Sequence, residues 1–366
     1  MIRTKILLLL IFILFLIGIR MSLKTKNSNL ETIQISTTSQ QMIQKKSIVK
    51  NSSIFIPYWA LPQSKEDIDA YDRLMYFGIG VDENGAQKNE IGYKQLSEFQ
   101  AVTKGYFGKK SLVIRMLDTE NNTKILNNEK IQNTIILEIN NLVNENGFTE
   151  LALDLELSGL FNTDITNKVN LFVQKIYTLE NRYYKHFSVI IYGDVFYRSR
   201  PFDIKSIGNN CDELMIMAYD FSKPYGEPGP NFPYEDKEKW GYDFKEMIRD
   251  YTLQIVPEKL SVIFGMYGYN WTLNQQGTPL KRAETVTVNQ IKKILNSKLS
   301  FDKAQDKQIL NKSQIPNSKE KKIEYVDSEN QKHVMWYEDE ESAQVKIDYL
   351  KEKGVGSIGY WAYGYF

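Results

Sequence analysis

The amino-acid sequence predicts an α/β protein built on a closed barrel of eight parallel strands, a (β/α)₈ or TIM barrel. From about Ser53 onward, short runs rich in β-branched and aromatic residues alternate with segments of helical periodicity. Strict alternation of strands and helices requires parallel strands, and eight of them favour closure into a barrel. A doubly wound open sheet is the alternative, but no glycine-rich phosphate-binding loop follows the first strand.

The strands and helices of this barrel can be placed in order along the chain. Between the third and fourth strands, Ile131–Asn146 has apolar residues at helical spacing and is followed by Gly147, a typical helix end. The last barrel helix is expected at Glu341–Lys353. The predicted strands are Ile54–Trp59, Leu74–Ile79, Ser111–Arg115, Glu150–Leu157, Ser188–Tyr192, Glu213–Tyr219, Leu260–Met266 and Gly356–Tyr363.

The barrel domain is expected to span residues 51–366, with one insertion at about 274–340. The inserted residues are polar, rich in Lys, Asn and Gln, and do not fit a single βα unit. Lys322–Val326 and His333–Tyr337 resemble the two strands of a hairpin. We therefore expect a small α+β insertion between the seventh strand and the last helix.

The N-terminus carries a hydrophobic segment between basic residues. An unbroken apolar run from 6 to 19 within residues 1–26 predicts a secretory signal peptide or a membrane anchor. The run is shorter than the ~20 residues that comfortably span a bilayer, and no clear cleavage site follows it. A buried helix is disfavoured because no polar face interrupts the run. Residues 27–50 are predicted to form a flexible tether, and the protein to be extracellular or on the cell surface.

Composition excludes several function classes. The 366 residues carry 46 Lys plus Arg against 45 Asp plus Glu, so no basic surface favours nucleic acid. The lone Cys211 cannot form an intramolecular disulfide and is expected to be buried. His186 and His333 lack metal-ligand spacing, so no metal site is expected. We expect a monomer.

The most informative stretch is the predicted fourth strand. Leu151, Leu153, Leu155 and Leu157 share one face, whereas Asp154 and Glu156 share the other. In a barrel the leucine face packs under the helices, so both carboxylates point inward at the strand's carboxyl end, where barrel active sites lie. Two such carboxylates should hold one proton above its normal pKa, as a general acid requires. The alternative is a pair of solvated or ion-paired acids.

Several motifs in order resemble glycoside hydrolase family 18, the chitinase family, over about residues 53–366. Asp154-Leu155-Glu156 is similar to the second half of its D-x-x-D-x-D-x-E signature, and Met217-Ala218-Tyr219-Asp220 to its M-x-Y-D. The last strand, with Trp361, resembles the family's closing segment. The segment His333–Asp339 followed by Ser342 looks like the spore-germination and cortex-lytic type.

The resemblance implies a role for each candidate residue. Glu156 would protonate the glycosidic oxygen, while the substrate's own 2-acetamido carbonyl acts as nucleophile. Asp154 would orient the acetamide N–H, and Tyr219 would hydrogen-bond its oxygen; Tyr219 as a core residue is the alternative. No cofactor is required, and the partner is an N-acetylglucosamine polymer. Candidates for binding sugar are Trp361, Asp220, Met217, Tyr58, Trp59 and Trp271.

The chain also departs from the family pattern. Thr149 and Ala152 stand where the signature has its first two aspartates. The missing middle aspartate would normally share a proton with Asp154, which predicts slower chemistry. Two hypotheses follow: a retaining glycosidase acting on peptidoglycan or chitin-like polymers, or a glycan-binding barrel that has lost efficient catalysis. Retention of Asp154 and Glu156 favours the enzyme, and the loss at Ala152 favours the binding protein.

Overall fold

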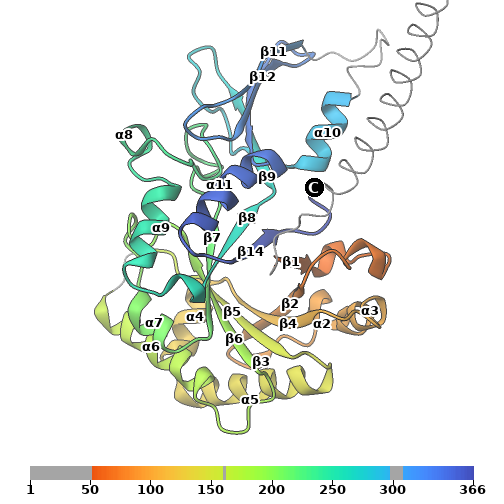
Figure 1. Cartoon of the computed structure of the whole chain (residues 1–366), viewed down its shortest axis with the longest axis vertical. Coiled ribbons are helices and arrows are strands. Elements are labelled where there is room, and N and C mark those ends of the chain that lie inside the picture. Colours follow the sequence, from red (N-terminus) through yellow and green to blue (C-terminus); the bar gives the residue numbers. More distant parts are fainter. Residues whose placement is uncertain (1–51, 160–161, 297–307) are drawn as a thin grey trace, which may run out of the picture. The chain divides into compact units, whose positions relative to one another are not determined.

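A computed structural model describes residues 52–159, 162–296 and 308–366. Eight parallel strands form a closed barrel, because the first strand pairs with both the second and the last. Figure 1 shows these strands at the centre, with helices around them. The predicted fold class is therefore confirmed. In barrel order the strands are β1 (Ser52–Pro57), β2 (Arg73–Asp82), β4 (Lys109–Met116), β5 (Glu150–Leu155), β6 (His186–Tyr192), β7 (Glu213–Ala218), β8 (Leu260–Gly265) and β14 (Ser357–Trp361).

Helices connect most of the strands and cover the outside of the barrel. The predicted helix at 131–146 is α5, whose N-cap Asn128 accepts hydrogen bonds from two backbone N–H groups. The connection from β1 to β2 contains two short 3₁₀ helices, Tyr58–Ala60 and Lys65–Asp67. The helices are α2 (Ile91–Lys94), α3 (Leu96–Val102), α4 (Thr119–Leu126), α5 (Glu129–Glu145), α6 (Thr163–Tyr177), α7 (Ile204–Asn209), α8 (Lys237–Trp240), α9 (Phe244–Thr252), α10 (Val288–Asn296) and α11 (Glu340–Glu352).

Alternation along each strand divides the core into two layers. The outward face packs against the helices in one large cluster that includes the leucines of β5 and Cys211. The inward face fills the barrel with a smaller cluster that includes Val113, Ala152 and Met215. The two faces predicted for the fourth strand are thus both confirmed, and the inner layer forms an apolar floor beneath the candidate carboxylates.

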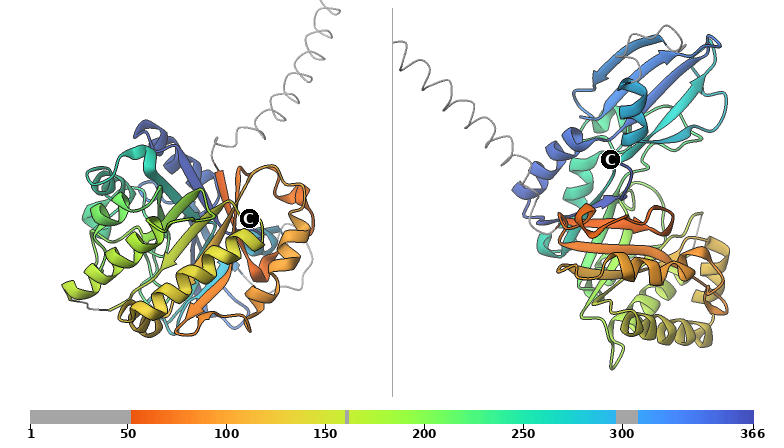
Figure 2. Two further views of the ribbon diagram at one scale, coloured as in Figure 1. Left: turned by 90° about the horizontal axis from the view of Figure 1, so that it is seen from below. Right: turned by 90° about the vertical axis from the view of Figure 1, so that its right-hand side faces the viewer.

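The insertion is larger than the sequence predicted and begins earlier. A five-stranded antiparallel sheet of order β10-β9-β13-β12-β11 follows the barrel strand β8, and only Met266 separates β8 from β9. The right-hand view of Figure 2 shows this sheet as a separate layer of strands from the barrel. The hairpin predicted at 322–337 is confirmed. The strands are β9 (Tyr267–Leu273), β10 (Glu284–Thr287), β11 (Gln308–Gln314), β12 (Lys321–Val326) and β13 (Lys332–Tyr337), while a two-residue strand β3 (Gly85–Ala86) pairs with β2.

The insertion begins at Tyr267 and not at about residue 274, because β9, for which no strand was predicted, belongs to the second sheet. Tyr267, Tyr269, Trp271 and Leu273 alternate along β9 and pack together in the core of the second sheet. That period-two pattern is the signal of a strand with one buried face. The remaining expectations, a signal or anchor at 1–26 and a tether at 27–50, lie outside the described residues. Within the described part of the chain, no helix has the length and apolar character needed to cross a bilayer.

Candidate active site

The two candidate carboxylates lie where β5 ends. Asp154 is on the inner face of the strand and only 4% exposed, and Glu156 follows directly after the last residue of β5. The backbone of Glu156 is fixed on both sides: its N–H donates to the Met116 carbonyl at 2.8 Å, and its carbonyl accepts from the Asn122 side chain at 2.7 Å. The barrel therefore places both acids at its carboxyl-terminal end, as the period-two pattern predicted.

Both carboxyl groups hold their protons more tightly than in water. Burial, and then the neighbouring Glu156, raise the pKa of Asp154 well above its ordinary value, and Arg115 only partly opposes this. Burial also raises the pKa of Glu156, against a hydrogen bond from Tyr192 that lowers it. The Oδ1 atom of Asp154 has no hydrogen-bond partner among the described residues. The raised pKa values favour retention of a proton by the pair, as a general acid requires.

The motif at the end of β7 comes to the same place. Met217 is buried in the inner cluster beside Ala152, and Tyr219 packs against that cluster. Burial, and then Asp154 and Glu156, raise the pKa of Tyr219 well above its ordinary value, so its hydroxyl stays protonated and can donate a hydrogen bond. Asp154, Glu156 and Tyr219, predicted separately from two motifs, therefore form one cluster.

Asp220 is turned toward the insertion. Its carboxylate accepts hydrogen bonds from the hydroxyls of Tyr267 and Tyr269, the latter at 2.6 Å, and both tyrosines belong to β9. Its backbone N–H donates to Oδ1 of Asn231 at 2.8 Å, and its φ of 56° lies in the left-handed region. Asp220 was predicted to bind sugar, and its observed partners belong to neighbouring elements of the chain.

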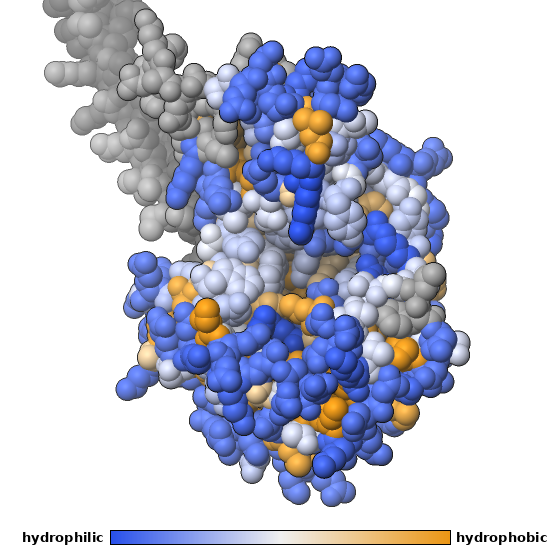
Figure 3. All heavy atoms as spheres, turned by 180° about the vertical axis from the view of Figure 1, so that it is seen from behind, coloured by the Kyte–Doolittle hydropathy of each residue, from blue (hydrophilic) through white to orange (hydrophobic). Residues whose placement is uncertain are grey.

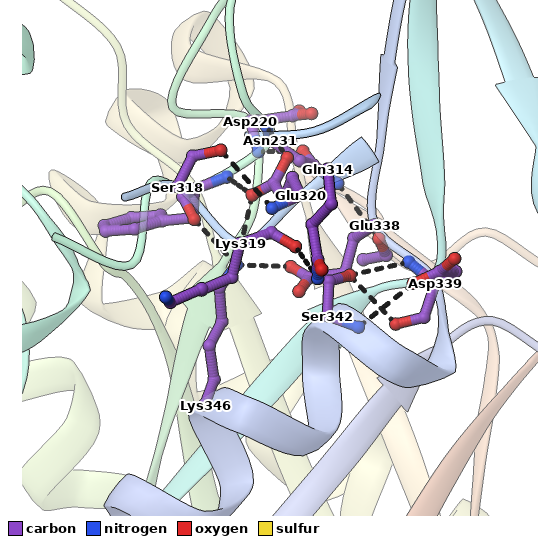
Figure 4. Close-up of polar contacts among 12 residues, drawn as sticks. Asp220, Asn231, Gln314, Ser318, Lys319, Glu320, Glu338, Asp339, Ser342 and Lys346 are labelled. Atoms are coloured by element: carbon purple, nitrogen blue, oxygen red, sulfur yellow. Dashed lines mark hydrogen bonds and ion pairs between the residues drawn. The ribbon is translucent and has the colours of Figure 1, made fainter. Parts of the chain in front are cut away.

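A buried network supports this conformation from below, as Figure 4 shows for Asp220, Asn231, Glu320 and Lys346. The backbone N–H groups of Asn231 and Phe232 donate to the two carboxylate oxygens of Glu320, at 2.5 and 2.7 Å. Lys346 of α11 bonds Glu320 at 3.1 Å and Glu338 at 2.7 Å. Lys346, Glu320 and Glu338 have no exposed surface. This buried triad thereby ties the insertion and the last helix to the loop that follows β7.

Aromatic side chains border the carboxylates. Trp361, half-buried at the end of β14, lies 4.7 Å from Phe77 and 6.2 Å from Trp59 between ring centroids. Trp59 is 49% exposed, so part of its side chain is accessible to a ligand. Tyr58 packs 5.3 Å from the guanidinium of Arg115. These three predicted candidates thus lie around one region at the top of the barrel, where planar rings are suited to the apolar faces of sugars.

Trp271 does not belong to that region. Its side chain has no exposed surface, and its indole N–H donates to the Gly226 carbonyl at 2.9 Å. It lies within β9, not at the end of a barrel strand. The expectation that Trp271 contacts sugar is therefore corrected: its indole forms the core of the second sheet and holds the loop after β7 against it.

Three residues near the carboxylates were missed by sequence reasoning. Tyr192 ends β6 and donates to Oε2 of Glu156 at 2.8 Å. Arg115 lies beside Asp154 in the register of β4 and β5 and forms an ion pair with Glu90 at 2.6 Å. Lys223 is also close enough to lower the pKa of Glu156. Position at the carboxyl end of a barrel strand was the available signal for Tyr192 and Arg115.

Two cavities lie at opposite ends of the barrel. One, of about 320 Å³, lies near the carboxyl ends of β2 and β4 and is lined by Gly80, Arg115 and Asn121 among others. The other, of about 430 Å³, lies at the amino ends of the strands, where buried Arg73 pairs with Glu213 at 2.6 Å. Neither cavity is lined by Asp154, Glu156 or Tyr219, so these residues themselves locate the site, at the carboxyl ends of the strands, where barrel chemistry occurs. The face in Figure 3 is mostly hydrophilic, with apolar side chains in small patches.

The described residues contain no group of three or more His, Cys, Asp or Glu side chains arranged as metal ligands. The polar groups at the carboxyl end of the barrel include a general-acid candidate, a second carboxylate and two tyrosine hydroxyls. Such a set can donate a proton, stabilise a developing positive charge and orient a polar substrate group.

Comparison with known proteins identifies the family. The chain matches the sequence model of the Glycosyl hydrolases family 18 over residues 39–365. The Cortical fragment-lytic enzyme of Bacillus anthracis is 25% identical over 246 residues, which cover 66% of this chain and 52% of that protein. The chain thus spans about half the length of this curated relative.

Solved structures show the same fold. The spore cortex-lytic enzyme SleL of Bacillus cereus superposes with a TM-score of 0.67 at 20% identity, covering 86% of this chain and 71% of that one. The Class V chitinase of Nicotiana tobaccum superposes with a TM-score of 0.71 at 15% identity, covering 86% and 94%. The resemblance inferred from the motifs is confirmed, and the protein belongs to family 18 of the glycosyl hydrolases.

Proposed function

We propose that the protein is a retaining glycosidase that cleaves β-linked N-acetylglucosamine-containing polysaccharide, with Glu156 as general acid and base. The observation that carries the proposal is the cluster of Asp154, Glu156 and Tyr219 at the carboxyl end of the barrel. The pKa of Glu156 is raised by burial, so its carboxyl retains the proton that a departing sugar oxygen needs.

In the first step Glu156 gives its proton to the glycosidic oxygen as the bond to the anomeric carbon breaks. The carbonyl oxygen of the substrate's 2-acetamido group bonds to that carbon, and a cyclic oxazolinium ion forms. Asp154 accepts a hydrogen bond from the acetamide N–H and stabilises the positive charge. The hydroxyl of Tyr219 donates to the acetamide oxygen and orients it for attack.

In the second step a water molecule attacks the anomeric carbon from the face that the leaving sugar vacated. The Glu156 carboxylate takes a proton from that water, which restores the acid, and the bond to the acetamide oxygen breaks. Two displacements at one carbon retain its configuration. Trp361 and Trp59 would stack on the sugar rings, while Tyr58, Met217 and Asp220 would shape the walls of the site.

The substrate class we propose is peptidoglycan or a chitin-like polymer. Peptidoglycan is favoured by similarity to a protein named as a cortical fragment-lytic enzyme, and chitin by structural similarity to a class V chitinase. We further propose that residues 1–26 direct the protein to the extracellular space or anchor it at the cell surface, through the apolar run at 6–19. This location would bring a monomeric enzyme to a cell-wall glycan.

A second candidate function is glycan binding with little or no catalysis. Ala152 favours it, as does Oδ1 of Asp154, which has no hydrogen-bond partner in the described part of the chain. A carboxylate without its proton-sharing neighbour is less suited to cycle between charge states. Analysis of products distinguishes the two candidates. The full chain is incubated with N-acetylglucosamine oligosaccharides and with peptidoglycan, and products are identified by mass spectrometry and anomeric proton resonances. Initial formation of the β-anomer supports the proposal, whereas saturable binding without products supports the second candidate.

A further inference from the structure

The Glu156 carboxyl has a partner that none of the motifs includes. The hydroxyl of Tyr192 donates to Oε2 of Glu156 at 2.8 Å. Tyr192 is the last residue of β6, whose neighbours in the barrel are β5 and β7. Because Oε2 already accepts this hydrogen bond, the acidic proton of Glu156 is directed to Oε1. The contact therefore selects which oxygen presents the proton to a substrate.

Tyr192 is in turn held by a cation. The guanidinium carbon of Arg200 lies 3.6 Å from the centroid of the Tyr192 ring, well inside the range of a cation–π contact. Arg200 is fixed by Asp194, which accepts from Nε at 2.6 Å and from Nη2 at 2.9 Å. A positive charge on the ring face withdraws electron density from the phenol. It thereby makes the Tyr192 hydroxyl a stronger donor toward Glu156.

Asp194, the carboxylate that holds Arg200, is itself fixed by several contacts. Asp194 is buried and also pairs with Arg198, which donates to the Phe221 carbonyl at 2.9 Å. Burial would raise the pKa of Asp194, but the ion pairs with Arg200 and Arg198 lower it below its ordinary value. Asp194 therefore remains ionised and keeps the Arg200 guanidinium against the ring. Arg198, held by the same carboxylate, joins the loop after β6 to the loop after β7.

Several other groups act on Glu156 and must be weighed with Tyr192. Asp154 and Asp220 disfavour its ionised form, whereas Lys223 and Arg200 favour it. Tyr192 differs from these four because it contacts the carboxyl directly through a hydrogen bond. The ionisable groups that face Glu156 are Asp154 from β5, Tyr192 from β6, Arg200 from the following loop, and Tyr219, Asp220 and Lys223 after β7.

We propose that Tyr192, clamped by Arg200, is a positioning residue that orients the acidic proton of Glu156 and stabilises the carboxylate left when that proton is transferred. The inference deepens the proposed function and rests on it for its catalytic meaning. In the first step the O–H bond of Glu156 breaks, its proton moves to the glycosidic oxygen, and negative charge forms on the carboxyl. The Tyr192 hydroxyl then donates to a full carboxylate, where a hydrogen bond is strongest.

The test is a direct titration of Glu156 that needs no substrate. The full chain is labelled with ¹³C at the glutamate δ-carbons, and the Glu156 resonance is assigned by its loss in Glu156→Gln. The midpoint of its titration is compared in wild type, Tyr192→Phe and Arg200→Met. Losing a hydrogen bond to a charged group should move the midpoint upward by about one pH unit in Tyr192→Phe. Arg200→Met should move it in the same direction by less, and Arg200→Lys should reverse part of that change.

Tyr183→Phe is the matched control, since Tyr183 is a half-exposed tyrosine that precedes the opposite end of β6. A midpoint unchanged or lowered in both Tyr192→Phe and Arg200→Met, with native circular dichroism, overturns the inference. The outcome is separable from that of the proposed function. If the wild-type chain titrates as expected but hydrolyses no glycan, the proposed function fails and the Tyr192 contact stands. If the wild-type chain hydrolyses glycan but the variants titrate like wild type, the inference about Tyr192 fails and the proposed function stands.

Discussion

Ala152 lies two residues before Asp154 on the inner face of β5, and it offers that carboxylate nothing polar. Ala152 has no exposed surface and packs in the apolar inner layer of the barrel. Oδ1 of Asp154, directly above this layer, lacks a hydrogen-bond partner among the described residues. The family signature has an aspartate at the position of Ala152. This chain therefore has Glu156 and Asp154 but lacks the group that would share a proton with Asp154.

Restoring that group should improve catalysis. In Ala152→Asp the new carboxyl can bond Oδ1 of Asp154, and one hydrogen bond of ordinary strength corresponds to a rise in kcat of roughly threefold to tenfold. Ala152→Asn is the control, because an amide donates a hydrogen bond but cannot exchange a proton with Asp154. Steady-state kinetics on an N-acetylglucosamine oligosaccharide measures the effect. Equal kcat values for wild type and a folded Ala152→Asp would show that the missing aspartate does not limit this enzyme.

Tyr219→Phe should reduce turnover more than binding. The hydroxyl would assist the substrate acetamide chiefly as charge develops, and removing one such donor costs about 10² in kcat. KM should change by less than about threefold. The comparison is between kcat and KM for wild type and variant. A fall in affinity with unaltered kcat would remove Tyr219 from the chemical step and make it a binding residue.

Trp59→Ala should weaken substrate binding with little effect on kcat. The ring is 49% exposed and borders Trp361, so its loss removes stacking surface without opening the core. An aromatic contact of about 1 kcal/mol corresponds to a KM increase of roughly fivefold. Phe107→Ala is the control, since Phe107 is 97% exposed and precedes the amino end of β4. A KM that is the same in both variants would place the bound glycan away from Trp59.

The buried triad should make folding stability depend on pH. Burial raises the pKa of Glu338 from 4.5 to about 8, although Lys346 opposes the shift. The folded state therefore binds this proton more tightly than the unfolded state. Its stabilisation is fully present below about pH 4.5 and is lost as pH rises toward 8, at up to about 1.4 kcal/mol per pH unit.

Glu338→Gln replaces this acid by a neutral group and should flatten the loss of stability between about pH 5 and pH 8. Exposed Glu329→Gln, in the turn of the same hairpin, should leave it unaltered. Thermal unfolding of the full chain at several pH values gives both curves. Parallel curves for wild type and Glu338→Gln would mean that Glu338 is already ionised in the folded protein.

The barrel could be predicted from the sequence because each of its strands is indicated by a local pattern of residues. Each barrel strand is a short buried run, and on β5 the alternation of leucine with acid specifies which face points inward. The same local rule was present in Tyr267–Leu273, where no strand was predicted and the structure has β9.

The site was only partly predictable for a different physical reason. Asp154, Glu156 and Tyr219 belong to motifs on two strands, so their meeting follows from the barrel itself. Tyr192 and Arg200 carry no motif, and their contact depends on the path of the loop after β6. Asn231 and Glu320 are 89 residues apart in the chain, and no local pattern relates them. Trp271 is an aromatic residue of the kind that can stack on sugars, but only the packing of the folded chain shows that its side chain is buried.

The most direct test of the central claim is turnover by Glu156→Gln beside the wild type. Glutamine preserves the size of the side chain and can still meet the Tyr192 hydroxyl, but it cannot give a proton to the glycosidic oxygen. The full chain and the variant are compared on a fluorogenic N-acetylglucosamine oligosaccharide, with binding of the same sugar measured by calorimetry. We predict that the variant loses at least about 10³ of kcat and keeps its affinity within about threefold. A variant that cleaves as fast as the wild type would contradict the role assigned to Glu156.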